Sequence, residues 1–197
     1  MNISIDDLDT GDILLCCGKD CISKAIEYFT GSKISHVAMV LNNPKYINNS
    51  LNGLFVLQTT ISKNMDLDDN CIKSGVQLIS LDELLNEYNT IYVRRLYMNK
   101  NEDFNRKIKD TYFSIKNKPY DTDLFDWLKA DLNIHIFNEK KTNTFWCSAL
   151  LTYIYIKLDL LYNDIDWTIV KPSQLSSNDK NKLYFINSTF SNDILLK

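Results

Sequence analysis

Short runs of branched apolar residues fill the first half of the chain, and this pattern predicts β-strands. The run at 12–16 follows a turn-forming Thr-Gly pair, and the run at 35–41 stops at Asn-Asn-Pro, as buried strands commonly do. Similar runs predict further strands at 54–57, 76–79 and 91–96, with a polar loop between the first two, and a last strand at 183–186.

Apolar residues three and four positions apart predict helices, mainly in the second half of the chain. These helices are expected at 102–116, 121–132 and 147–158. Two shorter helices are expected earlier. One covers 22–29 and ends before Gly31, and the other starts at the capping box formed by Ser80 and Glu83 and runs to about Tyr88.

Strands that lie close together in the sequence, followed by helices, predict an α+β fold in which a largely antiparallel sheet packs against helices. The sequence has no internal repeat, no linker rich in Gly, Ser or Pro, and no block of like charge. We therefore expect one domain over residues 1–197. Its last strand is expected at the edge of the sheet, followed by a loose tail at 187–197.

Composition excludes several classes of protein. The 197 residues are 45% hydrophobic, and 22 Lys and Arg stand against 25 Asp and Glu, so the chain has no basic field for nucleic acid. No apolar run reaches the roughly 20 residues that cross a bilayer, and the start is acidic where a secretory signal would be basic. The five cysteines are too sparse for a disulfide scaffold. These features predict a cytoplasmic protein without an integral membrane segment.

Cys147 is the candidate nucleophile, because it falls in the first turn of the helix predicted at 147–158. Unpaired backbone N–H groups and the positive end of the helix dipole at this position stabilise a thiolate, and they could also stabilise an oxyanion. The alternative is that Cys147 is a small buried residue beneath Trp146, with no chemical role.

His36 is the candidate base, because it stands at the start of an apolar strand and is therefore expected at the rim of the sheet. The other histidine, His135, lies among apolar residues without a recognisable pattern and is the weaker candidate. A purely structural role for His36 remains the alternative.

No metal or cofactor site is predicted. Cys16, Cys17, Cys21 and His36 lack the paired C-x-x-C spacing of a zinc site. The acidic segment 66–70 resembles the start of a calcium loop, but the Gly and Glu that such a loop needs are missing, so we expect a solvated loop. The sequence also has no Gly-rich loop that could hold a phosphate group.

Four short motifs and a closing segment carry a family resemblance. They are GDILL at 11–15, SHVAMV at 35–40, KPYD at 118–121, FWCSAL at 145–150 and KPSQL at 171–175. Their order and spacing resemble the circularly permuted branch of the NlpC/P60 superfamily, which has a papain-like fold and includes the YiiX-like bacterial proteins and a poxvirus group. The resemblance covers about residues 10–175, and in this branch the catalytic histidine precedes the cysteine.

The resemblance implies a role for each matching residue. Cys147 would be the nucleophile and His36 its base, and Gln58 would orient the imidazole where the family typically has a Glu. Tyr120 aligns with a position near the cleft, where its hydroxyl could contact the substrate or the oxyanion. Gln58 could equally be a polar residue at a strand end, and Tyr120 could be ordinary packing.

The predicted function is therefore a thiol hydrolase or acyltransferase that acts on an amide, isopeptide or lipid ester bond of a peptide, protein or acyl-lipid substrate. The alternative is a papain-like binding module that is weakened or inactive, since Gln58 cannot stabilise an imidazolium by charge. An Asn-, Ile- and Lys-rich composition and the poxvirus resemblance suggest a viral protein of the host cytoplasm or the virion. Nothing in the sequence indicates an oligomeric state.

Overall fold

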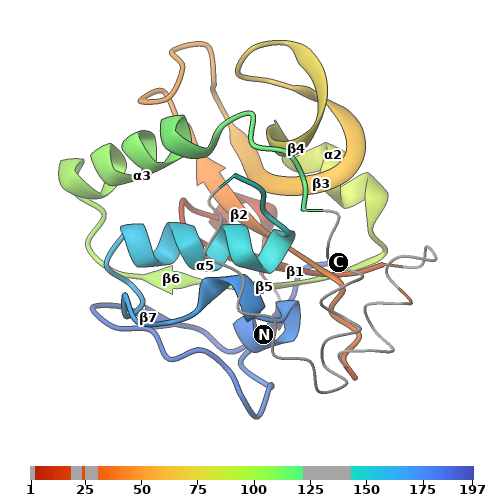
Figure 1. The fold of residues 1–197 in the computed structure, drawn as a ribbon, viewed down its shortest axis with the longest axis vertical. Coiled ribbons are helices and arrows are strands. Elements are labelled where there is room, and N and C mark those ends of the chain that lie inside the picture. The colour runs from red at the N-terminus through yellow and green to blue at the C-terminus, as the bar shows by residue number, and fades with distance from the viewer. Residues whose placement is uncertain (1–2, 19–23, 25–30, 122–142) are drawn as a thin grey trace.

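The structure is a computed structural model that describes residues 3–18, 24, 31–121 and 143–197 (Figure 1). The helices expected at 22–29 and 121–132 lie almost wholly outside these ranges, and so do Cys21 and His135. Within the described ranges the chain forms one large sheet, one small sheet, three α-helices and three short 3-10 helices.

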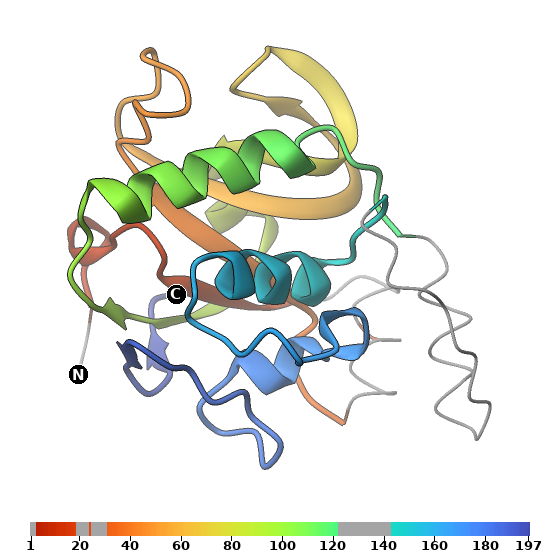
Figure 2. The same ribbon diagram turned by 60° about the vertical axis from the view of Figure 1, so that its left-hand side comes forward.

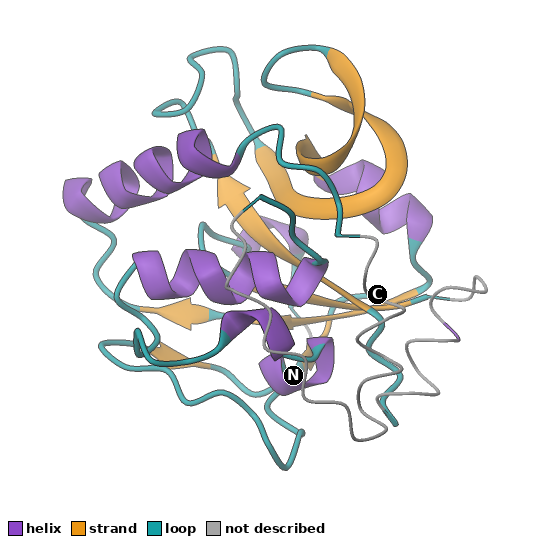
Figure 3. Cartoon of the chain, in the orientation of Figure 1, coloured by secondary structure: helices purple, strands orange, loops and turns teal. Residues whose placement is uncertain are grey.

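The large sheet has six strands, and every neighbouring pair in it is antiparallel. The strand order is β4-β3-β2-β1-β5-β8. The strands are β1 (Ile13–Cys17), β2 (His36–Asn42), β3 (Leu54–Asp66), β4 (Cys71–Ser80), β5 (Thr90–Arg94) and β8 (Ile194–Leu195). The antiparallel sheet packed against helices confirms the predicted α+β class (Figure 3).

Side chains alternate along each strand, so the sheet has two buried faces with separate cores. In β1, Ile13 and Leu15 join the larger core, while Leu14 and Cys16 join the smaller one. Strand β1 lies between β2 and β5 in the middle of the sheet, and both of its faces are buried. This explains why its sequence is apolar without interruption.

The helices α3 (Glu102–Ile115) and α5 (Cys147–Lys157) cover one face of the sheet, as Figure 2 shows, and contribute to the larger core. Nine of the eleven residues of α5 are buried, which makes it a core helix. The short helix α2 (Leu81–Glu87) contributes to the core on the opposite face. Its N-cap is Ser80, whose side chain accepts a hydrogen bond from the Glu83 N–H, as the capping pattern predicts.

The polar loop expected after residue 57 is instead the far half of a long hairpin. Strand β3 continues to Asp66, and β4 begins at Cys71 after a short turn. A β-bulge between Thr60 and Asn64 lets the mixed polar sequence stay in the ladder. The prediction of a solvated acidic loop at 66–70 is wrong for its first residue. Asp66 is fully buried, and its carboxylate lies 2.7 Å from the Lys73 ammonium group.

The chain after residue 182 differs from the prediction. No strand forms at 183–186, because these residues bond to η3 and to the loop after α5: the Leu183 N–H donates to the Gln174 carbonyl and the Ile186 N–H to the Leu160 carbonyl. The expected loose tail is ordered. In it, β7 (Thr189–Phe190) pairs with β6 (Leu96–Tyr97) in the small sheet, and β8 forms the edge of the large sheet beside β5.

The strand expected at 91–96 is divided between the two sheets at Arg95. The buried carboxylate of Asp12 accepts hydrogen bonds from the N–H groups of Leu96 and Asp9, and it lies 2.7 Å from the Arg95 guanidinium. Asp12 therefore joins the start of β1 to the point where the chain changes sheets. The 3-10 helices are η1 (Ile5–Asp7), η2 (Trp167–Ile169) and η3 (Pro172–Leu175), and η3 packs against β1, β2 and α5.

Candidate functional site

Cys147 is the first residue of α5 and is 4% exposed. The segment before it is held against two other parts of the chain. The Phe145 N–H donates to the Pro119 carbonyl, and the Phe145 carbonyl accepts hydrogen bonds from the Asp121 N–H and the Thr59 hydroxyl. These contacts fix the position of the thiol relative to the end of the sheet.

Two opposing effects act on the thiol. Burial raises the pKa of Cys147 from 9.0 to about 11, even though backbone N–H groups of Val37, Ser148 and Cys147 itself lower it. The stabilisation expected at the helix N-terminus is present, but the loss of solvent outweighs it. The sulfur is therefore a thiol at neutral pH, and it needs a base before it can attack.

His36 is the first residue of β2 and is buried, with 7% of its surface exposed. Its Nε2–H donates to Gln58 Oε1 over 2.8 Å. The ring also stacks on Tyr88, with the two planes 2° from parallel and the centroids 5.5 Å apart. An amide and an aromatic ring thus fix the orientation of the imidazole.

The sulfur of Cys147 contacts the backbone of β2 next to His36. The amide that contacts the sulfur belongs to Val37, the residue after His36. The ladder between β2 and β3 ends at Met39 and Leu57, so both His36 and Gln58 lie beyond its last pair. Burial raises the pKa of Cys16, which is opposite His36 in the β1–β2 ladder, and the neighbouring Cys17 and Cys147 raise it further.

Tyr120 lies beside the segment that leads into α5, because it forms an isolated parallel bridge with Phe145. Its side chain is partly buried against the larger core. Burial raises the pKa of the Tyr120 hydroxyl, and the charges of Cys147 and Asp121 raise it further, so the hydroxyl is a proton donor near the sulfur.

Sequence reasoning missed three residues that position this site. Tyr88 ends α2 and stacks on His36, which only the packing of α2 on the sheet determines. Thr59 bonds to the segment before Cys147. Gly75 has φ +95°, and a Cβ there would lie 2.3 Å from the Lys118 carbonyl oxygen. Because Gly75 falls in the polar loop expected before residue 76, the sequence pattern gave no signal for this close backbone approach.

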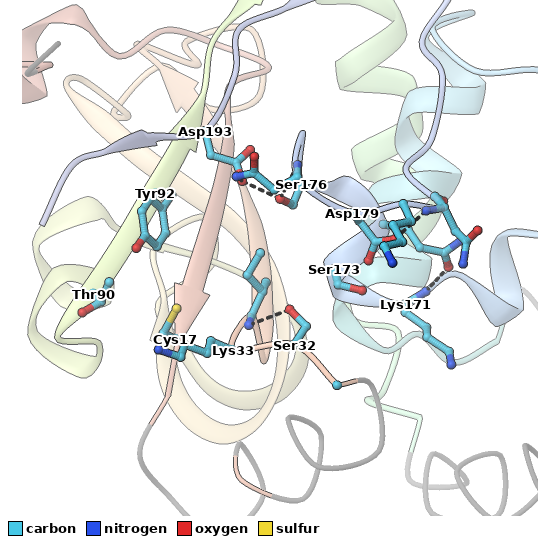
Figure 4. A pocket seen from close by; sticks show the side chains of 16 residues that line it. Cys17, Ser32, Lys33, Thr90, Tyr92, Lys171, Ser173, Ser176, Asp179 and Asp193 are labelled. Carbon is cyan, nitrogen blue, oxygen red and sulfur yellow. Dashed lines mark hydrogen bonds between the residues drawn. The ribbon is translucent and has the colours of Figure 1, made fainter.

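An open pocket of about 860 Å³ lies at the ends of β1 and β5 (Figure 4). Thr90 and Tyr92 line one side of it in this view, and Lys171 and Ser173 of the η3 region line the other. Lys33, shortly before β2, also contributes to it. Most of the lining side chains are polar or charged.

Two further findings concern only the part of the chain that the structure describes. No helix there is long and apolar enough to cross a membrane. The same residues form no group of three or more His, Cys, Asp or Glu side chains that could hold a metal ion.

Comparison with known proteins identifies the family. Residues 7–195 match the family described as "Permuted papain-like amidase enzyme, YaeF/YiiX, C92 family". The chain belongs to this family of permuted papain-like amidases. The match covers nearly the whole sequence and supports a cysteine-type hydrolase.

A solved structure agrees with this family assignment. It is described as the metalloprotein yiiX from Escherichia coli O157:H7, and it superposes with a TM-score of 0.53 at 16% identity, over 93% of this chain and 96% of that chain. At this identity the likeness shows the shared fold, and it confirms the predicted permuted papain-like architecture. Among curated proteins, no sequence matches significantly.

Proposed function

We propose that this permuted papain-like amidase hydrolyses an amide bond through an acyl-enzyme on Cys147. His36 would act as the base, with Gln58 holding its imidazole and Tyr120 donating to the reacting group. The observation that carries the proposal is the contact of the Cys147 sulfur with the Val37 amide, one residue from the His36–Gln58 pair.

Acyl transfer would begin when the sulfur attacks the substrate carbonyl while its proton moves to His36. Because the pKa of the thiol is about 11, proton transfer would accompany the attack and would not precede it as a stable ion pair. The oxyanion would be stabilised by N–H groups at the start of α5 and by the Tyr120 hydroxyl.

The tetrahedral intermediate would then collapse by breaking the C–N bond, and His36 would give its proton to the departing amine. A water molecule would attack the thioester carbonyl, with His36 again taking a proton. Cleavage of the C–S bond would release the acid and return the thiol. An acceptor other than water at this second step would make the enzyme an acyltransferase.

The pocket of Figure 4 favours a peptide or another polar amide over an acyl lipid. It lies at the end of the sheet where β2 begins, and its lining carries three lysines and two aspartates. None of the four proposed site residues lines it, so it would hold a part of the substrate away from the reacting bond. A fatty acyl chain gains little from such a surface, whereas the backbone and carboxylate groups of a peptide find hydrogen-bond and charge partners there.

The experiment is mass spectrometry of the intact protein after brief mixing with amide substrates: peptides, peptidoglycan fragments and isopeptide-linked conjugates, together with acyl lipids. We expect a mass increase equal to the acyl group, localised to Cys147 and absent from the Cys147→Ala variant. An adduct in both proteins, or hydrolysis that persists in the variant, would contradict the proposal.

The alternative is a binding module that keeps the fold without turnover, which Gln58 in place of Glu motivates. Substrate binding without an acyl adduct or hydrolysis would favour it.

We also propose that residues 1–197 form one domain related to the NlpC/P60 and poxvirus groups, and that it acts in the cytoplasm.

A further inference from the structure

Gln58 and Gln77 face each other directly across the β3–β4 ladder. Opposed residues of an antiparallel pair project from the same face, with Cβ atoms about 5 Å apart. Both side chains are buried, with exposed fractions of 1% and 0%. A buried amide needs partners for its N–H and C=O groups, because water does not supply them.

Each of the two amides has one atom that no described residue pairs with, and the two atoms are complementary. They are the donor Nε2 of Gln58 and the acceptor Oε1 of Gln77. The other end of the Gln77 amide is engaged, since its Nε2 donates to the carbonyls of Ser62 and Gly75 over 3.3 and 3.4 Å.

The two backbone carbonyls determine how the Gln77 amide is oriented. A carbonyl only accepts hydrogen bonds, so the NH2 end of Gln77 must face Ser62 and Gly75. Oε1 is then the end of the amide that points away from those carbonyls. It forms no hydrogen bond with Gln58 Nε2 in this structure, so it acts on Gln58 through the attraction between an acceptor and the NH2 group. An acceptor in that place favours the NH2 end of Gln58, and so directs Gln58 Oε1 toward His36.

The orientation of the Gln58 amide determines the tautomer of His36. With Oε1 toward the ring, Nε2 carries the proton and Nδ1 is the unprotonated nitrogen, which is the form that the proposed base needs. With the amide reversed, Nε2 would accept and the proton would sit on Nδ1, the tautomer that cannot act as the base.

We infer that Gln77 is a positioning residue that selects the base-competent tautomer of His36 through Gln58. This inference rests on the proposed function, in which His36 accepts the proton of Cys147. It also gives a physical reason for a second glutamine beside the first. A carboxylate at position 58 would accept a hydrogen bond from the ring through either of its oxygens, whereas an amide accepts only through Oε1 and must be oriented.

The direct test is the tautomer of His36, measured by long-range ¹H–¹⁵N NMR of the imidazole at a pH where the ring is neutral. Cys147→Ala is the background for all samples, and His135→Gln removes the signals of the second histidine. We expect the Nε2–H tautomer in the parent protein. We expect a mixture, or the Nδ1–H form, after Gln77→Met. The parent pattern in the Gln77→Met protein would overturn the inference.

The second readout is the rate at which iodoacetamide alkylates Cys147. Gln77→Met should lower this rate by about tenfold, since a change that imposes the wrong histidine tautomer slows a Ser-His-Asp site by at least that much. The matched control is Ile79→Val, a change at a buried residue of β4 in the core on the α2 face. The control should keep the parent rate, and an equal loss in it would assign the effect to packing and overturn the inference.

A double substitution separates the roles of the two glutamines. In the Gln58→Glu background, which accepts from the ring in either orientation, Gln77→Met should no longer change the tautomer. A persisting tautomer change there would refute the action of Gln77 through Gln58. Failure of the proposed function looks different, because alkylation of Cys147 would then be independent of His36 while the tautomer still responded to Gln77.

Discussion

Removal of the imidazole at position 36 should make Cys147 less reactive than an ordinary thiol. The structure buries the sulfur and raises its pKa to about 11, so only about one molecule in 10⁴ carries a thiolate at pH 7 in the absence of a base. A free thiol of pKa about 8.5 is about 3% ionised at the same pH, roughly 300 times more.

Intrinsic nucleophilicity recovers part of this difference. A thiolate becomes more nucleophilic as its pKa rises, with a coefficient of about 0.4–0.5, so 2.5 pKa units are worth roughly tenfold or slightly more. The His36→Ala protein should therefore be alkylated at Cys147 about 20 to 30 times more slowly than N-acetylcysteine. The parent protein should react at least as fast as the free thiol, because His36 takes the proton during the attack.

The assay is timed reaction with iodoacetamide at pH 7, followed by peptide mass spectrometry that resolves Cys147 from the other cysteines. His135→Ala is the matched control, and its rate should equal that of the parent protein. Thermal melting of each variant establishes that it is folded. Equal rates for the parent and His36→Ala proteins would refute His36 as the base.

Three further predictions concern stability and the positioning of the site. Asp12→Ala leaves the Arg95 guanidinium and two backbone N–H groups without their buried acceptor. Denaturant unfolding should therefore show a free energy of unfolding lower by about 3–5 kcal/mol. A decrease below about 1 kcal/mol would contradict this account. Gly75→Ala forces a Cβ against the Lys118 carbonyl, which should displace the segment that carries Tyr120. The rate of adduct formation at Cys147 should fall by about tenfold to a hundredfold. An unchanged rate in the folded variant would show that this contact does not position the site. Alkaline pH should destabilise the fold, because the unfolded thiol ionises above about pH 9 while the folded Cys147 keeps its proton to about pH 11. The unfolded state then binds fewer protons, so stability falls as the pH rises, by about 2–3 kcal/mol for this group. Between pH 8 and 11 the melting temperature should fall less steeply with pH for Cys147→Ala than for the parent protein. Identical slopes for the two proteins would exclude the thiol as the cause.

Local sequence patterns predicted most of the elements that build the site. The apolar runs identified the cores of β1 and β2, and the Ser80 cap placed the start of α2. Helix periodicity placed Cys147 at the first residue of α5. These features depend on neighbours a few positions apart, which is the range over which hydrophobic alternation and capping act.

The pairing of distant segments could not be predicted in the same way. The edge strand β8 is only two residues long and carries no pattern of its own. It lies beside β5 because the edge of β5 away from β1 has backbone groups that need hydrogen-bond partners. The long hairpin of β3 and β4 also depends on cross-strand contacts, because a β-bulge interrupts its alternation.

The sequence by itself predicted a cysteine at the start of a helix and a histidine at the start of a strand as the candidates for chemistry, and the family resemblance added a glutamine where a glutamate is usual. The tertiary structure decided how they are tuned. Burial turns the expected thiolate of Cys147 into a thiol, and the facing amides of Gln58 and Gln77 give His36 an orientation that no local pattern encodes. The physical reason is that solvent exclusion and hydrogen-bond direction depend on groups that the fold brings together from distant parts of the chain.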